Sequence, residues 1–334
     1  MQKRLLFRVD GGKVWGVSMG HIKRSLLLAD KLSHTYKIVF IMKKYSDGVK
    51  FVTQKGFEVE TIDIDDNNDA SLIKFSDKYS PAKVIFDLYS NPYTTFFDYA
   101  RKKQIQTIVF DILGKCCGSP DILINDSFIK EFTNYSQLSD KTKMYLGPSY
   151  FIMDNPPSII PLKDSVRNVM ITMGGSDPAG LTVKILKVMM NTVNYHTHVV
   201  LGPAFTEHKS IYNIAKNREF IKIYENPLNF LELLSSQDVV ISAAGRTLCE
   251  CAYLGRPVIV VPSIEHEAKI SLEYARLTGS FDIGLWNEEV SPNKVISALN
   301  KYANSYTLRE YVFNYSMGLI DGLALERIMT LLGT

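Results

Sequence analysis

The first segment with the residue types of a reactive site follows an apolar run near the N-terminus and leads into a helical pattern. It contains Asp10, Gly11, Gly12, Gly20, His21 and Arg24. Its glycines let a backbone approach a ligand, and the start of the following helix offers unpaired amides to an anion. An imidazole titrates near neutral pH, so His21 is a candidate general base. The alternative is a histidine that only orders the loop.

The second segment, Gly174-Gly175-Ser176-Asp177, follows another apolar run and again precedes a helical pattern. Small residues there permit the close approach of a phosphate or a sugar. Ser176 or Asp177 can equally be the N-cap of the helix, and capping and binding are compatible. Gly202 follows a later apolar run and is added to the expected nucleotide contacts.

The third segment runs through Ala244, Gly245, Arg246 and Thr247 to Glu250. A strand that ends before Ala244 would deliver a turn of small residues to the ligand, with Thr247 on the first turn of the next helix, where a diphosphate can bind. Glu250 lies one turn further and can accept hydrogen bonds from both hydroxyls of a ribose. The alternative is structural, with Thr247 as the helix cap and Glu250 stabilising the helix dipole.

A fourth segment places Glu265, His266 and Glu267 in a row. A metal site is not predicted, because the three residues are consecutive and H-E-x-x-H is absent. We predict polar contacts from His266 and Glu267 to a sugar or a diphosphate, with a solvated helix start as the alternative. No metal and no cofactor are therefore expected.

Two aspartates end apolar runs in the first half of the chain, Asp87 and Asp111, and Tyr89 follows the first of them. These residues are candidates to hold a sugar or to orient His21. Either aspartate can instead cap the loop that follows it. Because open α/β sheets bind ligands at the carboxyl ends of their strands, we expect all of these residues at that edge.

The elements that must position these residues are those of a two-domain α/β protein. The chain has 334 residues, more than the roughly 250–300 at which one core splits into domains. Apolar runs of strand length alternate with helical patterns in the first half, and the rhythm restarts in the second. These runs are Leu5–Val9, Lys37–Ile41, Val84–Asp87, Thr107–Asp111, Val169–Met173, His198–Leu201, Ile221–Tyr224, Val239–Ser242 and Val258–Val261. Continuous runs of this kind are typical of parallel sheets that are buried on both faces.

Prolines mark the connection between the two halves. Residues 147–167 contain Pro148, Pro156, Pro157 and Pro161. Because this density breaks regular elements, we predict Rossmann-like domains at residues 1–150 and 151–334. The first would carry the base and the sugar side, and the second would bind the nucleotide. A helical pattern from Thr307 to Leu332 is a candidate to cross back to the first domain.

Composition narrows the expected partners. Hydrophobic residues make up 46% and charged residues 22% of the chain, and its Lys and Arg residues, which give a formal net charge of only +3, are scattered. Nucleic acid is therefore not an expected partner, although a local basic pocket for phosphate is compatible with these values. The four cysteines lack C-x-x-C spacing and are interpreted as reduced thiols. No apolar run reaches the roughly 20 residues of a membrane span and the N-terminus has no signal-peptide core, so a cytoplasmic protein without membrane insertion is expected.

Taken together, these segments resemble the UDP-2,4-diacetamido-2,4,6-trideoxy-β-L-altropyranose hydrolase family of pseudaminic acid biosynthesis. The resemblance spans nearly the whole chain and includes Arg8-Val9-Asp10-Gly11, Gly20-His21-Ile22-Lys23-Arg24, Leu146-Gly147-Pro148-Ser149-Tyr150, Met173-Gly174-Gly175-Ser176-Asp177, Asp321-Gly322 and Glu326-Arg327-Ile328. That family is in turn similar to the GT-B glycosyltransferases. The resemblance implies two Rossmann-like domains that face a cleft, need no metal and hold UDP mainly through the C-terminal domain.

The resemblance also implies roles for single residues. His21 matches the general base of the family, Glu250 matches the ribose-binding acid of the wider superfamily, and Gly245 with Thr247 matches its diphosphate loop. Water activated by the base would attack the anomeric carbon and release UDP with inversion. The positions that depart from the family pattern are Ser18 near the base, Arg246 in the diphosphate loop, and the pair His266 and Glu267.

The expected function is therefore that of a UDP-sugar hydrolase, which releases UDP and a free 2,4-diacetamido-trideoxy-hexose or a related amino-sugar for a nonulosonic acid pathway. One alternative is a GT-B glycosyltransferase, in which the same base activates an acceptor hydroxyl. Another is a nucleotide-sugar binding protein without turnover. By resemblance, the chain is expected to be a monomer.

Overall fold

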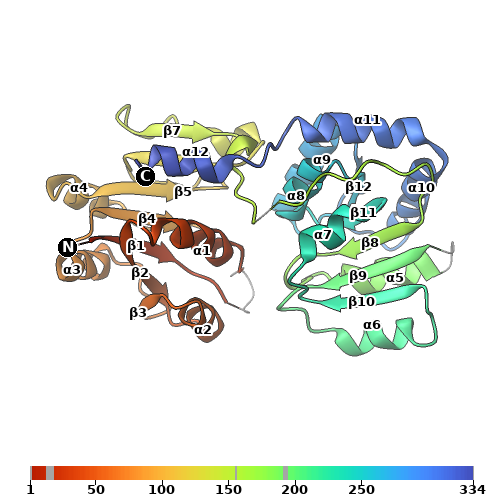
Figure 1. Cartoon of the computed structure of the whole chain (residues 1–334), viewed down its shortest axis with the longest axis horizontal. Coiled ribbons are helices and arrows are strands. Elements are labelled where there is room, and N and C mark those ends of the chain that lie inside the picture. The colour runs from red at the N-terminus through yellow and green to blue at the C-terminus, as the bar shows by residue number, and fades with distance from the viewer. Residues whose placement is uncertain (1, 13–18, 155, 191–194, 334) are drawn as a thin grey trace. The chain divides into compact units, whose positions relative to one another are not determined.

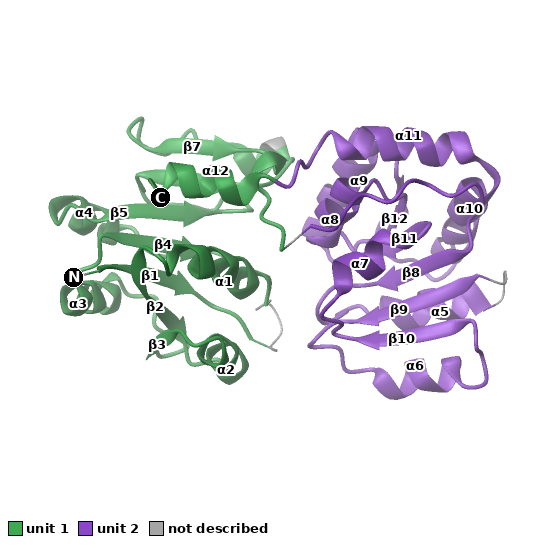
Figure 2. Cartoon of the chain, in the orientation of Figure 1, with its two compact units in different colours: residues 1–154, 323–334 green, residues 155–322 purple. Residues whose placement is uncertain are grey.

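The computed structural model describes residues 2–12, 19–154, 156–190 and 195–333, and it divides the chain into two compact units (Figure 2). Unit 1 consists of residues 1–154 and 323–334, and unit 2 of residues 155–322. The chain thus passes from one unit to the other four residues after the boundary expected at residue 150. The final helix belongs to unit 1.

Unit 1 is built around a parallel sheet of seven strands in the order β3-β2-β1-β4-β5-β6-β7 (Figure 1). Its strands are β1 (Lys3–Val9), β2 (Tyr36–Lys43), β3 (Glu58–Ile62), β4 (Lys83–Asp87), β5 (Gln106–Phe110), β6 (Ile122–Asn125) and β7 (Lys143–Leu146). Its helices are α1 (Gly20–Leu32), α2 (Ser46–Gln54), α3 (Asp69–Tyr79), α4 (Thr95–Lys102) and α12 (Ala324–Leu331), with the 3-10 helices η1 (Lys130–Thr133) and η2 (Pro148–Tyr150). The strand order reverses between β1 and β4, which makes the ends of these two strands the expected ligand edge.

Unit 2 repeats this plan with six parallel strands in the order β10-β9-β8-β11-β12-β13. Its strands are β8 (Asn168–Thr172), β9 (His196–Leu201), β10 (Ile221–Glu225), β11 (Val239–Ser242), β12 (Val258–Val260) and β13 (Phe281–Asp282). Its helices are α5 (Leu181–Met190), α6 (His208–Ala215), α7 (Phe230–Ser235), α8 (Thr247–Leu254), α9 (Glu265–Thr278), α10 (Ser291–Asn304) and α11 (Tyr306–Met317). Here the order reverses between β8 and β11. The prediction of two α/β domains with parallel sheets is confirmed.

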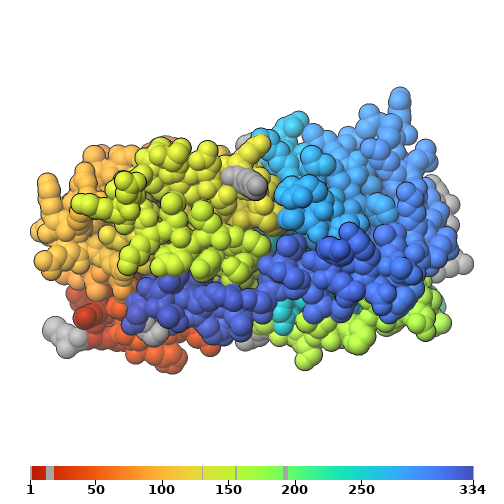
Figure 3. Space-filling view, turned by 90° about the horizontal axis from the view of Figure 1, so that it is seen from above, coloured from red at the N-terminus to blue at the C-terminus, as the bar shows by residue number. Residues whose placement is uncertain are grey.

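The core of unit 1 is completed by residues that are distant in sequence. Successive side chains of β1 point to opposite faces of the sheet, so Phe7 joins one apolar cluster and Leu6 the other. Helix α12 contributes Ala324, Ile328 and Leu332 to the cluster that contains Phe7. Figure 3 shows this last helix, in the darkest blue, against yellow-green residues of the same unit. Unit 1 is therefore built from two separate segments of the chain.

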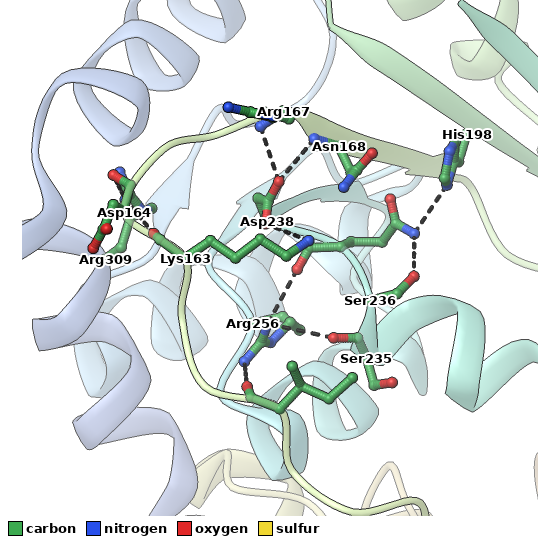
Figure 4. Close-up of polar contacts among 12 residues, drawn as sticks. Lys163, Asp164, Arg167, Asn168, His198, Ser235, Ser236, Asp238, Arg256 and Arg309 are labelled. Carbon is green, nitrogen blue, oxygen red and sulfur yellow. Dashed lines mark hydrogen bonds and ion pairs between the residues drawn. The ribbon is translucent and has the colours of Figure 1, made fainter.

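In unit 2, two buried arginines hold the segment that leads into β8 (Figure 4). Arg256 donates a hydrogen bond to the carbonyl oxygen of Ile160. Arg309 donates to the carbonyl oxygens of Lys163 and Asp164 at 2.9 and 2.8 Å. Because the acceptors are main-chain atoms, this attachment does not depend on which side chains the segment carries.

Asp238 holds the next part of the same segment. Its Oδ2 accepts hydrogen bonds from the backbone N–H groups of Arg167 and Asn168 at 2.9 and 2.8 Å, and its Oδ1 lies 3.4 Å from Lys163 Nζ. Residues 160–168 are thus held against the rest of unit 2.

Among the described residues, no helix is long and apolar enough to cross a membrane.

Candidate functional site

The reversal point of unit 1 brings His21 and Asp87 together. Val9, at the end of β1, is paired with Asp87, the last residue of β4, and α1 begins at Gly20. His21 Nδ1 lies 2.6 Å from Asp87 Oδ1. The His21 side chain is 14% exposed and that of Asp87 only 1% exposed, so the imidazole retains access to solvent while its partner is enclosed.

Arg24, one helical turn after His21, keeps this carboxylate ionised. Its Nε donates to Asp87 Oδ2 at 2.8 Å and its terminal nitrogen NH2 donates to Oδ1 at 2.6 Å. Burial acts to raise the pKa of Asp87, but the charges and hydrogen bonds of Arg24 and His21 outweigh it, so the pKa lies well below its usual value. Asp87 is therefore a carboxylate at neutral pH.

An ionised Asp87 fixes the tautomer of His21. A carboxylate only accepts hydrogen bonds, so Nδ1 of His21 must carry the hydrogen that joins the two groups. In the neutral imidazole the other nitrogen, Nε2, then holds the free electron pair. A carboxylate that holds one imidazole nitrogen and leaves the electron pair of the other available is an arrangement in which the imidazole can accept a proton.

The structure corrects the expected role of Arg24. We predicted a substrate contact, but the side chain is 1% exposed, its guanidinium lies 4.8 Å from the ring centroid of Phe110, and its terminal nitrogen NH1 donates to Asp126 Oδ2 at 3.1 Å. A guanidinium enclosed by two carboxylates and an aromatic ring positions other groups and does not reach a ligand. Asp126 was missed because β6, which ends just before it, was not recognised in the sequence.

Asp10 lies at the same sheet edge and is also held by an arginine. Arg8 binds both of its oxygens, at 2.7 and 2.8 Å, and donates through Nε to the hydroxyl of Tyr93 at 2.7 Å. Gly11 and Gly12 after it are buried. A Cβ on Gly12 would lie 3.0 Å from Tyr45, so packing is sufficient to explain this glycine. Contact of these residues with a substrate remains a prediction.

Asp111 and Tyr89, two further residues of unit 1 that the sequence singled out, differ in their surroundings. Asp111 Oδ2 accepts a hydrogen bond from the N–H of Cys116 at 2.6 Å, so Asp111 caps its own loop, which was the alternative that the sequence left open. Tyr89 is 49% exposed, and Lys115 Nζ lies 4.4 Å from its ring centroid. Ser18 lies outside the described residues.

In unit 2, the loop after β8 combines open space with a rigid support. A Cβ on Gly174, whose φ is +74°, or on Gly175 would meet nothing within 4 Å. A Cβ on Gly202 would come within 2.3 Å of Gly174 O, so Gly202 allows the loop after β9 to support this one from behind. Asp177 caps α5, because its two oxygens accept the N–H groups of Leu181 and Thr182. Ser176 is exposed.

The loop after β11 lies beside it, because Ser242 at the end of β11 is paired with Thr172 at the end of β8. Ala244 is buried and Gly245 is exposed, with no atom near an added Cβ. The N-cap position of α8 is Arg246, which makes no side-chain capping bond. Thr247 is thus the first residue of the helix and not its cap, and Glu250 is half-buried on the first turn.

Glu267, on the first turn of α9, is hydrogen-bonded to the loop that precedes this helix. Its Oε2 accepts the N–H of Ser263 at 2.7 Å, and burial raises its pKa although this bond and the neighbouring His266 act to lower it. His266 is half-buried on the first turn of α9. Within the described ranges, no group of three or more His, Cys, Asp or Glu side chains could hold a metal ion.

Comparison with solved structures identifies the architecture. The crystal structure of MurG from Acinetobacter baumannii superposes with a TM-score of 0.70 at 12% identity, covering 99% of each chain. The chain has the GT-B fold. Residues 169–305, in the second half of this GT-B chain, match the model of the glycosyltransferase family 28 C-terminal domain.

Three curated relatives are also similar to this GT-B protein. An uncharacterised protein of Methanocaldococcus jannaschii is 30% identical over 80% of this chain, which spans only 57% of that protein's length. The spore coat polysaccharide biosynthesis protein SpsG of Bacillus subtilis is 24% identical over 97% of this chain and 96% of its own. The Helicobacter pylori pseudaminic acid cytidylyltransferase and UDP-2,4-diacetamido-2,4,6-trideoxy-beta-L-altropyranose hydrolase is 31% identical over 43% of this chain and 26% of its own.

Proposed function

We propose that this chain is a UDP-sugar hydrolase that releases UDP and a free 2,4-diacetamido-trideoxy-hexose or a related amino-sugar for a nonulosonic acid pathway. The observation that carries the proposal is the buried carboxylate of Asp87 on Nδ1 of a partly exposed His21, at the reversal point of a parallel sheet. The names of the Bacillus and Helicobacter relatives, which refer to polysaccharide biosynthesis and to a UDP-sugar hydrolase, support this choice of substrate class.

In the proposed reaction, His21 Nε2 takes a proton from a water molecule as its oxygen attacks the anomeric carbon. The bond between that carbon and the UDP oxygen breaks, and UDP leaves with the electron pair. Attack from the face opposite the leaving group inverts the anomeric carbon. The imidazolium that forms is stabilised by the Asp87 carboxylate at 2.6 Å, and it returns its proton to solvent.

The nucleotide is assigned to unit 2 for a physical reason. The loops after β8 and β11 lie side by side at the reversal point of that sheet, and both present glycines with open space around them. Gly245 and Thr247 lie at the start of α8, and the positive end of a helix dipole is a favourable place for a diphosphate. Gly174, Gly175, Gly245 and Thr247 are the proposed contacts, with Glu250 on the ribose.

A glycosyltransferase is the second candidate, and the match to the glycosyltransferase family 28 C-terminal domain favours it. Its base would act on an acceptor hydroxyl in place of water. The decisive test is UDP release from a panel of UDP-amino-sugars with EDTA present and no acceptor added. Release together with a free sugar of inverted configuration supports the hydrolase. Release only after an acceptor is supplied supports the transferase, and UDP binding without any turnover supports a binding protein.

Replacing Glu250 with alanine is expected to weaken UDP binding roughly 10–100-fold, because hydrogen bonds to a charged group contribute about 1.5–3 kcal/mol. Isothermal titration calorimetry with UDP measures the change. Glu219→Ala serves as the control, because Glu219 is an exposed acid just before β10. It therefore lies at the amino ends of the parallel strands, whereas the proposed nucleotide contacts lie at their carboxyl ends. Equal affinities for the two variants would remove Glu250 from the nucleotide site.

A further inference from the structure

Asp126 is a second buried carboxylate near the reversal point of unit 1. It follows β6, two strands away from β4 in the sheet, and it is 6% exposed. Arg24 NH1 donates to its Oδ2 at 3.1 Å. A carboxylate is costly to bury unless it is paired, so its place beside this guanidinium needs a reason.

Arg24 connects Asp126 to Asp87. The guanidinium is planar and rigid, with two nitrogens on Asp87 and the third on Asp126. Phe110 lies 4.8 Å from it. Held at both ends, the plane cannot turn, and this fixes the direction in which it presents two N–H groups to Asp87.

The orientation of the Asp87 carboxylate in turn determines whether His21 Nδ1 has an oxygen to which it can donate a hydrogen bond. Oδ1 of Asp87 accepts from both Arg24 and His21 Nδ1, whereas Oδ2 accepts from Arg24 Nε and, at 3.4 Å, from the hydroxyl of Ser25. A guanidinium free to rotate would allow the carboxylate to rotate with it. The bond to Nδ1 would then be lost for part of the time, and with it the single tautomer of His21.

The charges agree with this arrangement. Two carboxylates and one guanidinium leave one net negative charge in the buried cluster of Asp87, Asp126 and Arg24. An imidazolium at His21 would balance that charge. Without Asp126 the cluster would be neutral.

We propose that Asp126 is a positioning residue that acts through Arg24 to hold the Asp87 carboxylate on Nδ1 of His21. This rests on the proposed function only for its effect on turnover. The geometric part concerns the free protein and can be tested without substrate.

The test combines two readouts on the full chain, with Asp126→Ala and Asp126→Asn as variants. The side-chain nitrogen spectrum of ¹⁵N-histidine-labelled protein reports which ring nitrogen of His21 carries hydrogen, and His21→Ala assigns the signal among the six histidines. In Asp126→Ala we expect the spectrum to change from one tautomer to a mixture. We also expect kcat for UDP release to fall roughly 10–100-fold, the loss typical for residues that orient the ligands of a metal site through hydrogen bonds, with KM unchanged.

Asp126→Asn keeps an oxygen that can accept from Arg24, so it should recover most of the single-tautomer spectrum. Asp98→Ala, on a side chain that is 71% exposed, should change neither readout. If Asp126→Ala does not fold, as judged by circular dichroism, Asp126→Leu replaces it, because leucine fills the space without accepting a hydrogen bond.

A folded variant without the acceptor that keeps the wild-type imidazole spectrum overturns the proposal. An altered spectrum with unchanged kcat supports the positioning of Asp87 by Asp126 and overturns the expected effect on turnover. If the unsubstituted chain releases no UDP from any substrate, the proposed function fails, and the spectrum alone then decides whether Asp126 positions Asp87.

Discussion

Replacing His21 with alanine is expected to lower the rate of UDP release roughly 10²–10⁴-fold, the usual contribution of a general base. The variant loses Nε2, the atom that accepts the proton of the attacking water, and the bond from Nδ1 to Asp87. UDP affinity should stay the same, because the proposed nucleotide contacts belong to unit 2. Steady-state kinetics with the best substrate of the panel and calorimetry with UDP measure the two quantities.

His34→Ala is the matched control. His34 is exposed and precedes β2, at the amino edge of the sheet, so its removal should leave the rate unchanged. A rate for His21→Ala within a factor of two or so of the wild type would eliminate the general-base assignment. A loss of UDP affinity equal to the loss of rate would instead place His21 in nucleotide binding.

Replacing Ile328 with alanine should destabilise unit 1 by about 2–5 kcal/mol, the usual range for truncating a fully buried aliphatic side chain. Ile328 is 0% exposed and belongs to the cluster that contains Phe7 and Ile152. The truncation leaves a cavity under α12. Hydrogen exchange of the β1 amides measures this unit specifically, whereas a global unfolding curve would combine the two units.

Thr330→Ala tests whether the effect comes from packing. Thr330 lies on the same helix, is exposed, and donates only to a carbonyl of its own helix, so the change should be within about 0.5 kcal/mol. Similar exchange rates in the two variants would mean that α12 contributes little to the core of unit 1.

Strands that are buried on both faces could be predicted from the sequence, because they read as continuous apolar runs. This identified β1, β2, β4 and β5 in unit 1 and β8, β9, β11 and β12 in unit 2; the edge strand β10, which has one buried residue, was also identified. β7 was missed because it is an edge strand without a buried residue. β3, the strand at the other edge of the sheet, was also missed and has a single buried residue. β6, with four buried residues, was missed although runs of the same length were identified elsewhere.

The site shows the same limit. His21 and Asp87 could be named because each follows or ends a recognisable strand. The inward direction of Arg24 could not be predicted, since it depends on Asp87 and Asp126, which are 63 and 102 residues away in sequence. A motif arginine next to a candidate base was interpreted as a ligand contact, whereas tertiary pairing makes it part of the support.

The two ends of the chain that form unit 1 also impose an order on biosynthesis. Residues 155–322 leave the ribosome before residues 323–334, so the whole of unit 2 is available to fold while unit 1 still lacks α12. At roughly 5–20 residues per second, that interval lasts on the order of ten seconds or more. During it, the apolar surface that Ala324, Ile328 and Leu332 later cover faces water. Transiently exposed apolar surface of this kind makes folding intermediates prone to aggregate, and here it lies on the unit that carries His21.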